Sequence, residues 1–187
     1  MIVAALLLFL AGSGDMFIVQ AGGGTSYGVA LSREALRTYV DDVGLFKRNM
    51  PGVVAVTPVG PETYLYQTEK SLPLAGTMKT DFVIQKRTVG DSLTIYESLD
   101  TADVNYMYCQ VLIRPAGPDT TTIEISLRLK LTREGGSEVH WLAPILGARF
   151  ISKEMSKDIE GMLETFVENS NQELYARLRP ETARIGG

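Results

Sequence analysis

The chain has 187 residues, of which 45% are hydrophobic and 21% are charged, a composition typical of one globular domain with a buried core. The formal net charge is −4 and the basic residues are scattered, which argues against a nucleic-acid-binding surface. A single cysteine, Cys109, and a single histidine, His140, exclude an internal disulfide and a multi-cysteine metal site. The sequence contains no glycine-rich nucleotide-binding motif. We therefore expect neither a metal nor a cofactor.

The first ten residues are almost wholly apolar, and small residues follow at positions 11–14. This segment is too short to cross a bilayer as a helix. It matches the hydrophobic part of a signal peptide, but no basic residue comes before Arg33. Three interpretations of residues 1–15 stay open: an export signal, a misassigned start with Met16 as the true beginning, or an extra apolar element of the fold. We expect a cytoplasmic protein unless residues 1–14 are a true signal peptide.

The next segment is rich in glycine. Phe17–Gln20 predicts a short strand or belongs to the N-terminal extension. The run Gly22–Gly24 lacks the lysine and the serine or threonine of a phosphate-binding loop, so it indicates a flexible connection. Ser26–Leu31 is the first predicted strand.

Two short helices are predicted after that strand. Ser32 is a typical N-cap residue, and the helix that it begins runs through Val40. A second short turn of helix is predicted over Leu45–Asn49. Pro51 and Gly52 end it, because proline and glycine interrupt regular structure.

From Val53 onward the apolar residues recur with a period of two, which predicts strands separated by turns. One face of each strand is apolar and the other is polar, as in an antiparallel meander with one buried face. The predicted strands are residues 53–58, 64–69, 78–85, 93–98, 106–114 and 123–131.

A long helix is predicted from Pro144 to about Leu178. Its apolar residues recur at helical spacing and form one stripe, while charged residues cover the opposite face. The stripe consists of Ile151, Met155, Ile159, Met162, Phe166 and Leu174. A stripe of this length needs a broad apolar surface, and the strands supply it. The predicted fold is therefore α+β: a curved antiparallel sheet of about six or seven strands that is wrapped on a long C-terminal helix.

This order of elements resembles the helix-grip fold of the START-like superfamily, also called SRPBCC or polyketide cyclase/dehydrase-like. The resemblance covers residues 26–178 and rests on the helix led by Ser32, on Met50–Val53 and on Pro58–Tyr64. The stretch 45–64 is most similar to the carbon monoxide dehydrogenase G branch of this superfamily. The domain is expected over residues 16–179, followed by a polar tail at 180–187.

The resemblance implies a deep cavity between the sheet and the long helix that holds lipids, sterols, polyketides or other apolar molecules. Several methionines on the expected wall suit a pocket that adapts to its ligand. The alternative is that the same apolar stripes form an ordinary core without a hollow. The residues predicted to bind the ligand are Tyr64, Tyr66, Met78, Thr80, Phe82, Met107, Cys109, Leu127, Phe150, Met155, Ile159, Met162 and Phe166.

Three functions are compatible with this pattern. The sequence contains no recognisable catalytic constellation, so binding or carriage of a hydrophobic small molecule ranks first. The second is a cyclase, dehydratase or hydrolase that uses Tyr66, Thr80 or His140. His140 is the one ready general base, although a junction histidine bonded to backbone is the simpler interpretation. The third is an accessory protein that docks to a larger enzyme or a membrane, as the resemblance to the carbon monoxide dehydrogenase G branch implies. An exposed apolar patch, for example at Tyr106 and Tyr108, would favour it.

Overall fold

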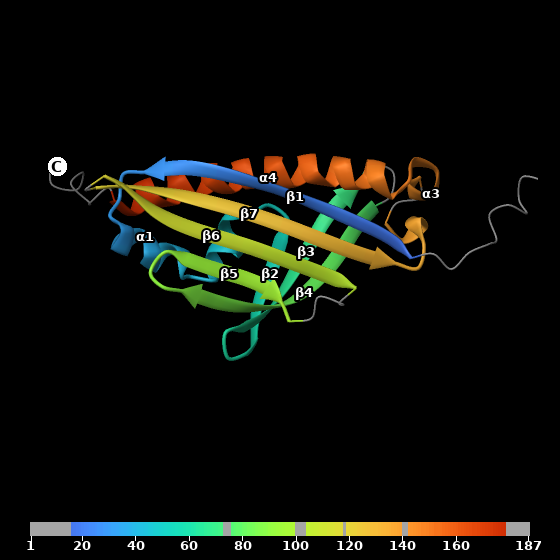
Figure 1. Ribbon diagram of the computed structural model, residues 1–187, viewed down its shortest axis with the longest axis horizontal. Coiled ribbons are helices and arrows are strands. Elements are labelled where there is room, and N and C mark those ends of the chain that lie inside the picture. Colours follow the sequence, from blue (N-terminus) through green and yellow to red (C-terminus); the bar gives the residue numbers. More distant parts are fainter. Residues whose placement is uncertain (1–15, 73–75, 100–103, 118, 140–141, 179–187) are drawn as a thin grey trace, which may run out of the picture.

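The computed structural model describes residues 16–72, 76–99, 104–117, 119–139 and 142–178 (Figure 1). Within these residues seven strands form one antiparallel sheet in the order β1-β7-β6-β5-β4-β3-β2. The strands are β1 (Phe17–Val29), β2 (Val53–Gly60), β3 (Thr63–Leu72), β4 (Gly76–Val89), β5 (Leu93–Ser98), β6 (Asn105–Gly117) and β7 (Thr120–Arg133). The helices are α1 (Arg33–Val40), α2 (Gly44–Asn49), the short 3-10 helix η1 (Gly136–Glu138), α3 (Ala143–Leu146) and α4 (Ala148–Leu178).

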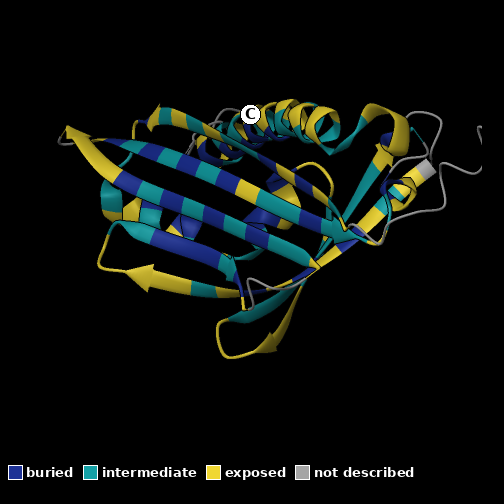
Figure 2. Ribbon diagram, turned by 45° about the vertical axis from the view of Figure 1, so that its right-hand side comes forward, coloured by how far each residue is buried: buried dark blue, intermediate teal, exposed yellow. Residues whose placement is uncertain are grey.

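This arrangement confirms the predicted helix-grip architecture. Two short helices follow the first strand, and α4 runs along the curved sheet beside β1 (Figure 1). Burial alternates along the central strands, as the period of two requires (Figure 2). The apolar leader, the polar tail, His140 and Trp141 lie outside the described residues.

The prediction of one unbroken helix from Pro144 was wrong. Gly147 interrupts it with a φ of 79°, and the backbone N–H of Gly147 donates to Ala143 O at 2.8 Å. This left-handed conformation costs a residue without a side chain little, so glycine commonly ends a helix. The result is a short α3 followed by the long α4.

The prediction of a flexible connection at Gly22–Gly24 was also wrong, because these glycines lie inside β1, which ends at Val29 rather than Leu31. They allow α4 to lie directly on the strand. A Cβ atom at Gly23 would lie 3.0 Å from Glu160 Cγ and 3.2 Å from Ile159 Cγ2. The glycines contribute no apolar alternation, so the pattern of a strand is absent from the sequence here although the strand is continuous.

Two serines on α4 fix the helix along the edge of the sheet. The backbone N–H of Gln20 donates to Ser152 Oγ at 3.1 Å, and that of Gly22 donates to Ser156 Oγ at 3.2 Å. Four helical residues rise about 6 Å, and two strand residues span about 6.8 Å, so the two spacings match. The serines thereby occupy donors that an edge strand would otherwise leave open.

A polar cluster joins α1 and α2 to the C-terminal half of α4. The carboxylate of Glu173 accepts hydrogen bonds from Asn49 Nδ2 at 2.6 Å, Tyr39 OH at 3.0 Å and Arg48 Nε at 3.2 Å, and it also pairs with Arg177. Burial by itself would raise the pKa of Glu173, but these hydrogen bonds and the two guanidinium charges outweigh burial and hold the pKa below its ordinary value. The carboxylate form therefore stabilises the folded state.

We predict that Gly23→Val lowers the free energy of unfolding by about 1–3 kcal/mol, because the added methyl groups collide with α4. Gly28→Val is the matched control, since it lies in the same strand and a Cβ atom at this position would have no other atom within 4 Å. Both substitutions raise the strand propensity of β1, but only Gly23→Val places methyl groups against α4. Thermal unfolding measures both, and equal melting temperatures would contradict the close approach.

We predict that Glu173→Gln destabilises the protein by about 2 kcal/mol near neutral pH, since it removes charge-assisted hydrogen bonds. The lowered pKa means that this stabilisation is complete above the ordinary glutamate pKa and is lost as the pH falls through the folded-state value. The difference between variant and parent should therefore shrink in acid. Urea unfolding over a descending pH series tests this, with exposed Glu168→Gln on the same helix as the control. A gap that does not change with pH would refute it.

Candidate functional site

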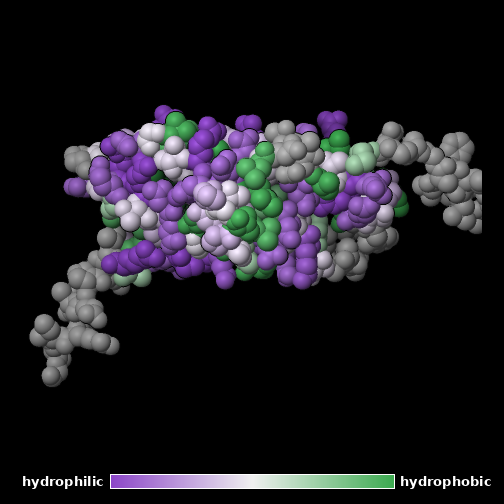
Figure 3. Space-filling model, turned by 90° about the horizontal axis from the view of Figure 1, so that it is seen from below, coloured by the Kyte–Doolittle hydropathy of each residue, from purple (hydrophilic) through white to green (hydrophobic). Residues whose placement is uncertain are grey.

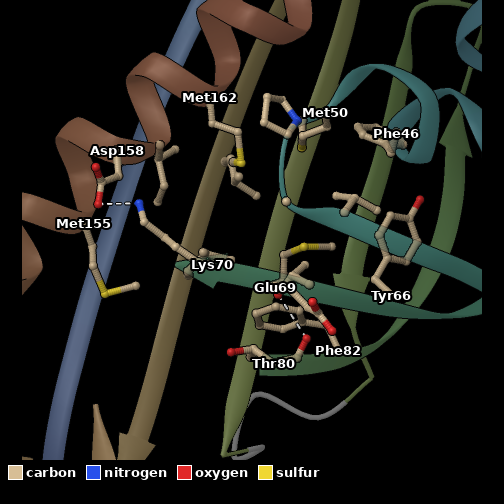
Figure 4. Close-up of a pocket in the computed structure, with 18 of the residues that line it drawn as sticks. Phe46, Met50, Tyr66, Glu69, Lys70, Thr80, Phe82, Met155, Asp158 and Met162 are labelled. Carbon is tan, nitrogen blue, oxygen red and sulfur yellow. Dashed lines mark hydrogen bonds and ion pairs between the residues drawn. The ribbon is translucent and has the colours of Figure 1, made fainter. Parts of the chain in front are cut away.

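A cavity of about 550 Å³ lies between α4 and the concave face of the sheet (Figure 4). Its volume falls within the range of small-molecule sites, and most of its wall is apolar. Strands β3, β4, β6 and β7 supply most of one side, together with Val53 of β2 and Tyr96 of β5, and α4 supplies the other. The C-terminal end of α2 closes one end through Phe46 and Met50.

The structure brings ten of the predicted site residues together in the wall of this cavity, and contact with a ligand stays a prediction for all of them. They are Tyr66, Met78, Thr80, Phe82, Met107, Cys109, Leu127, Met155, Ile159 and Met162.

The other three predicted residues, Tyr64, Phe150 and Phe166, do not line the cavity. Phe150 is 46% exposed, because it precedes Ile151 by one residue and so points about 100° away from the apolar stripe. Phe166 is buried and stacks on Phe46 with ring centroids 5.7 Å apart, so it supports the wall from behind. Tyr64 is half-buried and pairs with Ile84 and Pro58, one pleat beyond the wall.

Sequence reasoning missed Phe46 in α2 and Met50 at the C-cap of α2, although their spacing of four residues was a signal for one shared face. It also missed the charged rim of the cavity, formed by Glu69, Lys70, Lys157 and Asp158. No local pattern could have indicated the rim, because its members come from β3 and α4 and meet through the fold alone.

Each charged rim residue has a partner of opposite sign. Lys70 Nζ pairs with Asp158 across the gap between β3 and α4, as Figure 4 shows. Glu69 pairs with Lys79 at 2.8 Å, and Lys157 pairs with Glu154 at 2.8 Å. All four rim side chains are between 38% and 59% exposed, so these charges stay in contact with solvent.

The polar groups deeper in the wall are neutral. Burial raises the pKa of the Cys109 thiol to about 12 and raises those of Tyr66 and Tyr96 well above their ordinary values. All three stay protonated at neutral pH. The Tyr96 hydroxyl donates to Val40 O at 3.3 Å, whereas Tyr66 OH and Thr80 Oγ1 have no hydrogen-bond partner within the described part of the chain.

Two tyrosines on the outer face of the sheet have hydrogen-bonded hydroxyl groups. Tyr106 OH donates to Glu97 Oε1 at 2.8 Å, and Tyr108 OH donates to Gln110 Oε1 at 3.2 Å. They are half-buried on the side opposite the cavity, as their parity predicts, and they do not form an apolar patch.

The face of the molecule seen from below is mostly hydrophilic, with a hydrophobic area near its middle (Figure 3). Among the helices of the described residues, none has the length and hydropathy needed to span a membrane.

The sequence matches no protein-family profile and no curated protein. Solved structures do match: the di-domain ARO/CYC StfQ from the steffimycin biosynthetic pathway has a TM-score of 0.56, with 12% identity over 86% of this chain and 53% of StfQ. The chain has the helix-grip fold. It spans about half the length of StfQ, and it also matches the Zhui aromatase/cyclase from Streptomyces sp. R1128 with a TM-score of 0.52, 14% identity, and coverage of 87% of this chain and 98% of that one.

A protein from Thermus thermophilus shares the helix-grip fold as well, with a TM-score of 0.55 and 12% identity over 80% of this chain and 96% of that chain. Structural similarity at identities this low establishes the fold alone. The activity has to be inferred from the site. The fold that the START-like resemblance implied is thus confirmed, and the particular likeness to the carbon monoxide dehydrogenase G branch stays a prediction.

We predict that Cys109 in the folded protein reacts negligibly with iodoacetamide at about pH 8, because the reactive thiolate is suppressed by burial. After unfolding in guanidinium, labelling should be complete. The chain has one cysteine, so the mass increase of the intact protein reports this site alone. Rapid labelling of the folded protein would mean that the thiol is accessible through the cavity and ionised there.

Proposed function

We propose that this protein binds or carries a hydrophobic small molecule, lipid-like or polyketide-like, in the cavity between the sheet and α4. The observation that carries the proposal is the volume of about 550 Å³ with its apolar wall. An ordinary core would fill this space, because protein interiors pack to the density of organic crystals. The protein instead leaves a cavity, open to solvent at its charged rim, that is large enough for a molecule of drug-like size.

The residues of the wall fit an apolar guest. Five methionines line it: Met50, Met78, Met107, Met155 and Met162. Methionine is unbranched and polarizable, so it adapts to ligands of different shape. The charges are confined to the solvent-exposed rim, so a guest that passes the rim is in contact with apolar side chains and neutral hydroxyl groups.

A cyclase or dehydratase is the second candidate, because the similar structures include aromatase/cyclases. Its chemistry would have to use the hydroxyl groups of Tyr66 and Thr80, or His140, which lies outside the described residues. A raised pKa makes Tyr66 a hydrogen-bond donor rather than a base. Binding without chemistry therefore remains the function that we place first.

Native mass spectrometry of the protein purified from its own host tests the proposal, followed by extraction of whatever is bound. A stoichiometric apolar molecule that is recovered unchanged after incubation supports carriage. Recovery of a product that has lost water or gained a ring supports the cyclase. An empty protein that copurifies with a larger enzyme or with membranes favours the accessory role that the resemblance to the carbon monoxide dehydrogenase G branch implies.

We predict that Met162→Trp weakens binding of the neutral fluorescent probe N-phenyl-1-naphthylamine about tenfold or more, equivalent to about 1.4 kcal/mol. The indole would occupy space that the cavity offers to the probe. Phe150→Trp is the control, since this residue lies on α4 but outside the wall. Fluorescence titration measures both variants. Unchanged binding to Met162→Trp would show that α4 does not line the binding site.

A further inference from the structure

Two buried hydroxyl groups belong to residues of the cavity wall. Tyr66 OH and Thr80 Oγ1 are buried without a hydrogen-bond partner in the residues that the structure describes. Their residues are 3% and 5% exposed, so bulk solvent does not reach them freely. A buried polar group that stays unpaired costs about 1–3 kcal/mol, and such groups in a folded protein call for an explanation.

The surroundings of both hydroxyls explain why the protein leaves them unpaired. Tyr66 lies edge-on to Phe46 with ring centroids 6.0 Å apart, and the other buried tyrosine of the wall, Tyr96, uses its hydroxyl on Val40 O. Opposite Thr80, the Thr68 hydroxyl donates to the backbone carbonyl of Thr80 at 3.0 Å rather than to its side chain. Figure 4 shows Tyr66 and Thr80 projecting from β3 and β4 at separate places in the wall. Both residues line the cavity, so a molecule inside it lies beside both side chains.

The charges of the site restrict that molecule further. Lys70 and Lys157 are the basic residues of the wall, and each is paired at the exposed rim, with Asp158 and Glu154 respectively. The deeper groups are neutral. Burying a charge without a partner is far more costly than burying a neutral polar group. A carboxylate or ammonium group deep in the cavity would have no counter-charge among the described residues that line it.

We propose that the ligand is a neutral hydrophobic molecule that carries carbonyl or hydroxyl oxygens, and that Tyr66 and Thr80 are its hydrogen-bonding residues. This inference rests on the proposed function and narrows it, because it sets aside pure hydrocarbons and ionised fatty acids. Burial keeps the Tyr66 phenol protonated, so it donates to a ligand oxygen. The Thr80 hydroxyl can donate or accept, so it can pair with a carbonyl or with a hydroxyl.

Three ligands that share the fluorene ring system test the inference: fluorene, 9-fluorenone and fluorene-9-carboxylate. Each is titrated against bound N-phenyl-1-naphthylamine, and the loss of probe fluorescence gives its affinity. We expect 9-fluorenone to bind about five- to tenfold more tightly than fluorene, because its carbonyl satisfies a buried donor. The carboxylate should bind most weakly.

Isosteric variants assign the preference to the two hydroxyls. Tyr66→Phe combined with Thr80→Val removes both oxygens and preserves the shape of the wall. The double variant should bind 9-fluorenone no more tightly than it binds fluorene. Ser170→Ala is the control, because it removes another buried hydroxyl that has no partner among the described residues and lies outside the wall, and it should keep the preference for 9-fluorenone.

Thermal unfolding without ligand supplies an independent measurement. Substitutions that remove an unpaired hydroxyl should leave the melting temperature of the double variant equal to or higher than that of the parent. A merely structural hydroxyl would have the opposite effect, since its loss would destabilise the fold. A lower melting temperature would therefore overturn the inference.

Two further outcomes would overturn the inference while the proposed function stands: equal binding of fluorene and 9-fluorenone by the parent, or tightest binding of the carboxylate. A preference for 9-fluorenone that persists in the double variant would likewise exclude Tyr66 and Thr80 as its origin. If neither the probe nor any of the three ligands binds, the proposed function fails together with the inference.

Discussion

The close contact between α4 and β1 is the constraint on which the rest of this fold depends. Glycine at position 23 removes the side chain that would hold the helix away, and Ser152 and Ser156 bind the backbone of the strand. The helix is thereby fixed at one edge of the sheet, both in distance and in register. Because the sheet curves away from this contact, the helix and the strands nearer the other edge lie farther apart.

The cavity is the geometric result of that attachment. Next to β1 the helix and the sheet touch, whereas near β3 they are bridged by the long side chain of Lys70, which pairs with Asp158. At the far end, the stacked rings of Phe46 and Phe166 and the cluster around Glu173 tie α2 to α4. The helix is held at both ends of the cavity by these contacts. Its position therefore does not depend on side chains of the wall filling the space between helix and sheet.

The sequence predicted the elements whose pattern is local. The period of two located β5 at its observed bounds and placed β7 within three residues of them, because one face of each strand is buried. The helical stripe placed Met155, Ile159 and Met162 in the wall for the same reason. Phe150 was misplaced because its hydrophobicity was given more weight than its position, one residue before Ile151 and therefore about 100° from the stripe.

The features that the sequence did not reveal are those that need two distant segments. The glycines of β1 are needed because of α4, a helix more than 130 residues later in the chain. Without apolar alternation, the sequence of this strand cannot be told from that of a loop. The pairing of Lys70 with Asp158 is equally non-local. The unpaired state of Tyr66 and Thr80 depends on every neighbour in the folded wall, so it becomes visible in the structure alone.

The coverage of β1 by α4 also means that the two edges of the sheet are protected from self-association in different ways. At β1 the serines of α4 occupy backbone donors, so a strand from another molecule finds this edge blocked. The opposite edge is β2, where Pro58 lacks a backbone N–H and the register shifts twice, between Val53 and Ala55 and between Pro58 and Gly60. Proline and irregular pairing both hinder the addition of a strand. The sheet thus resists edge-to-edge aggregation by two different means, a helix on one side and an irregular strand on the other.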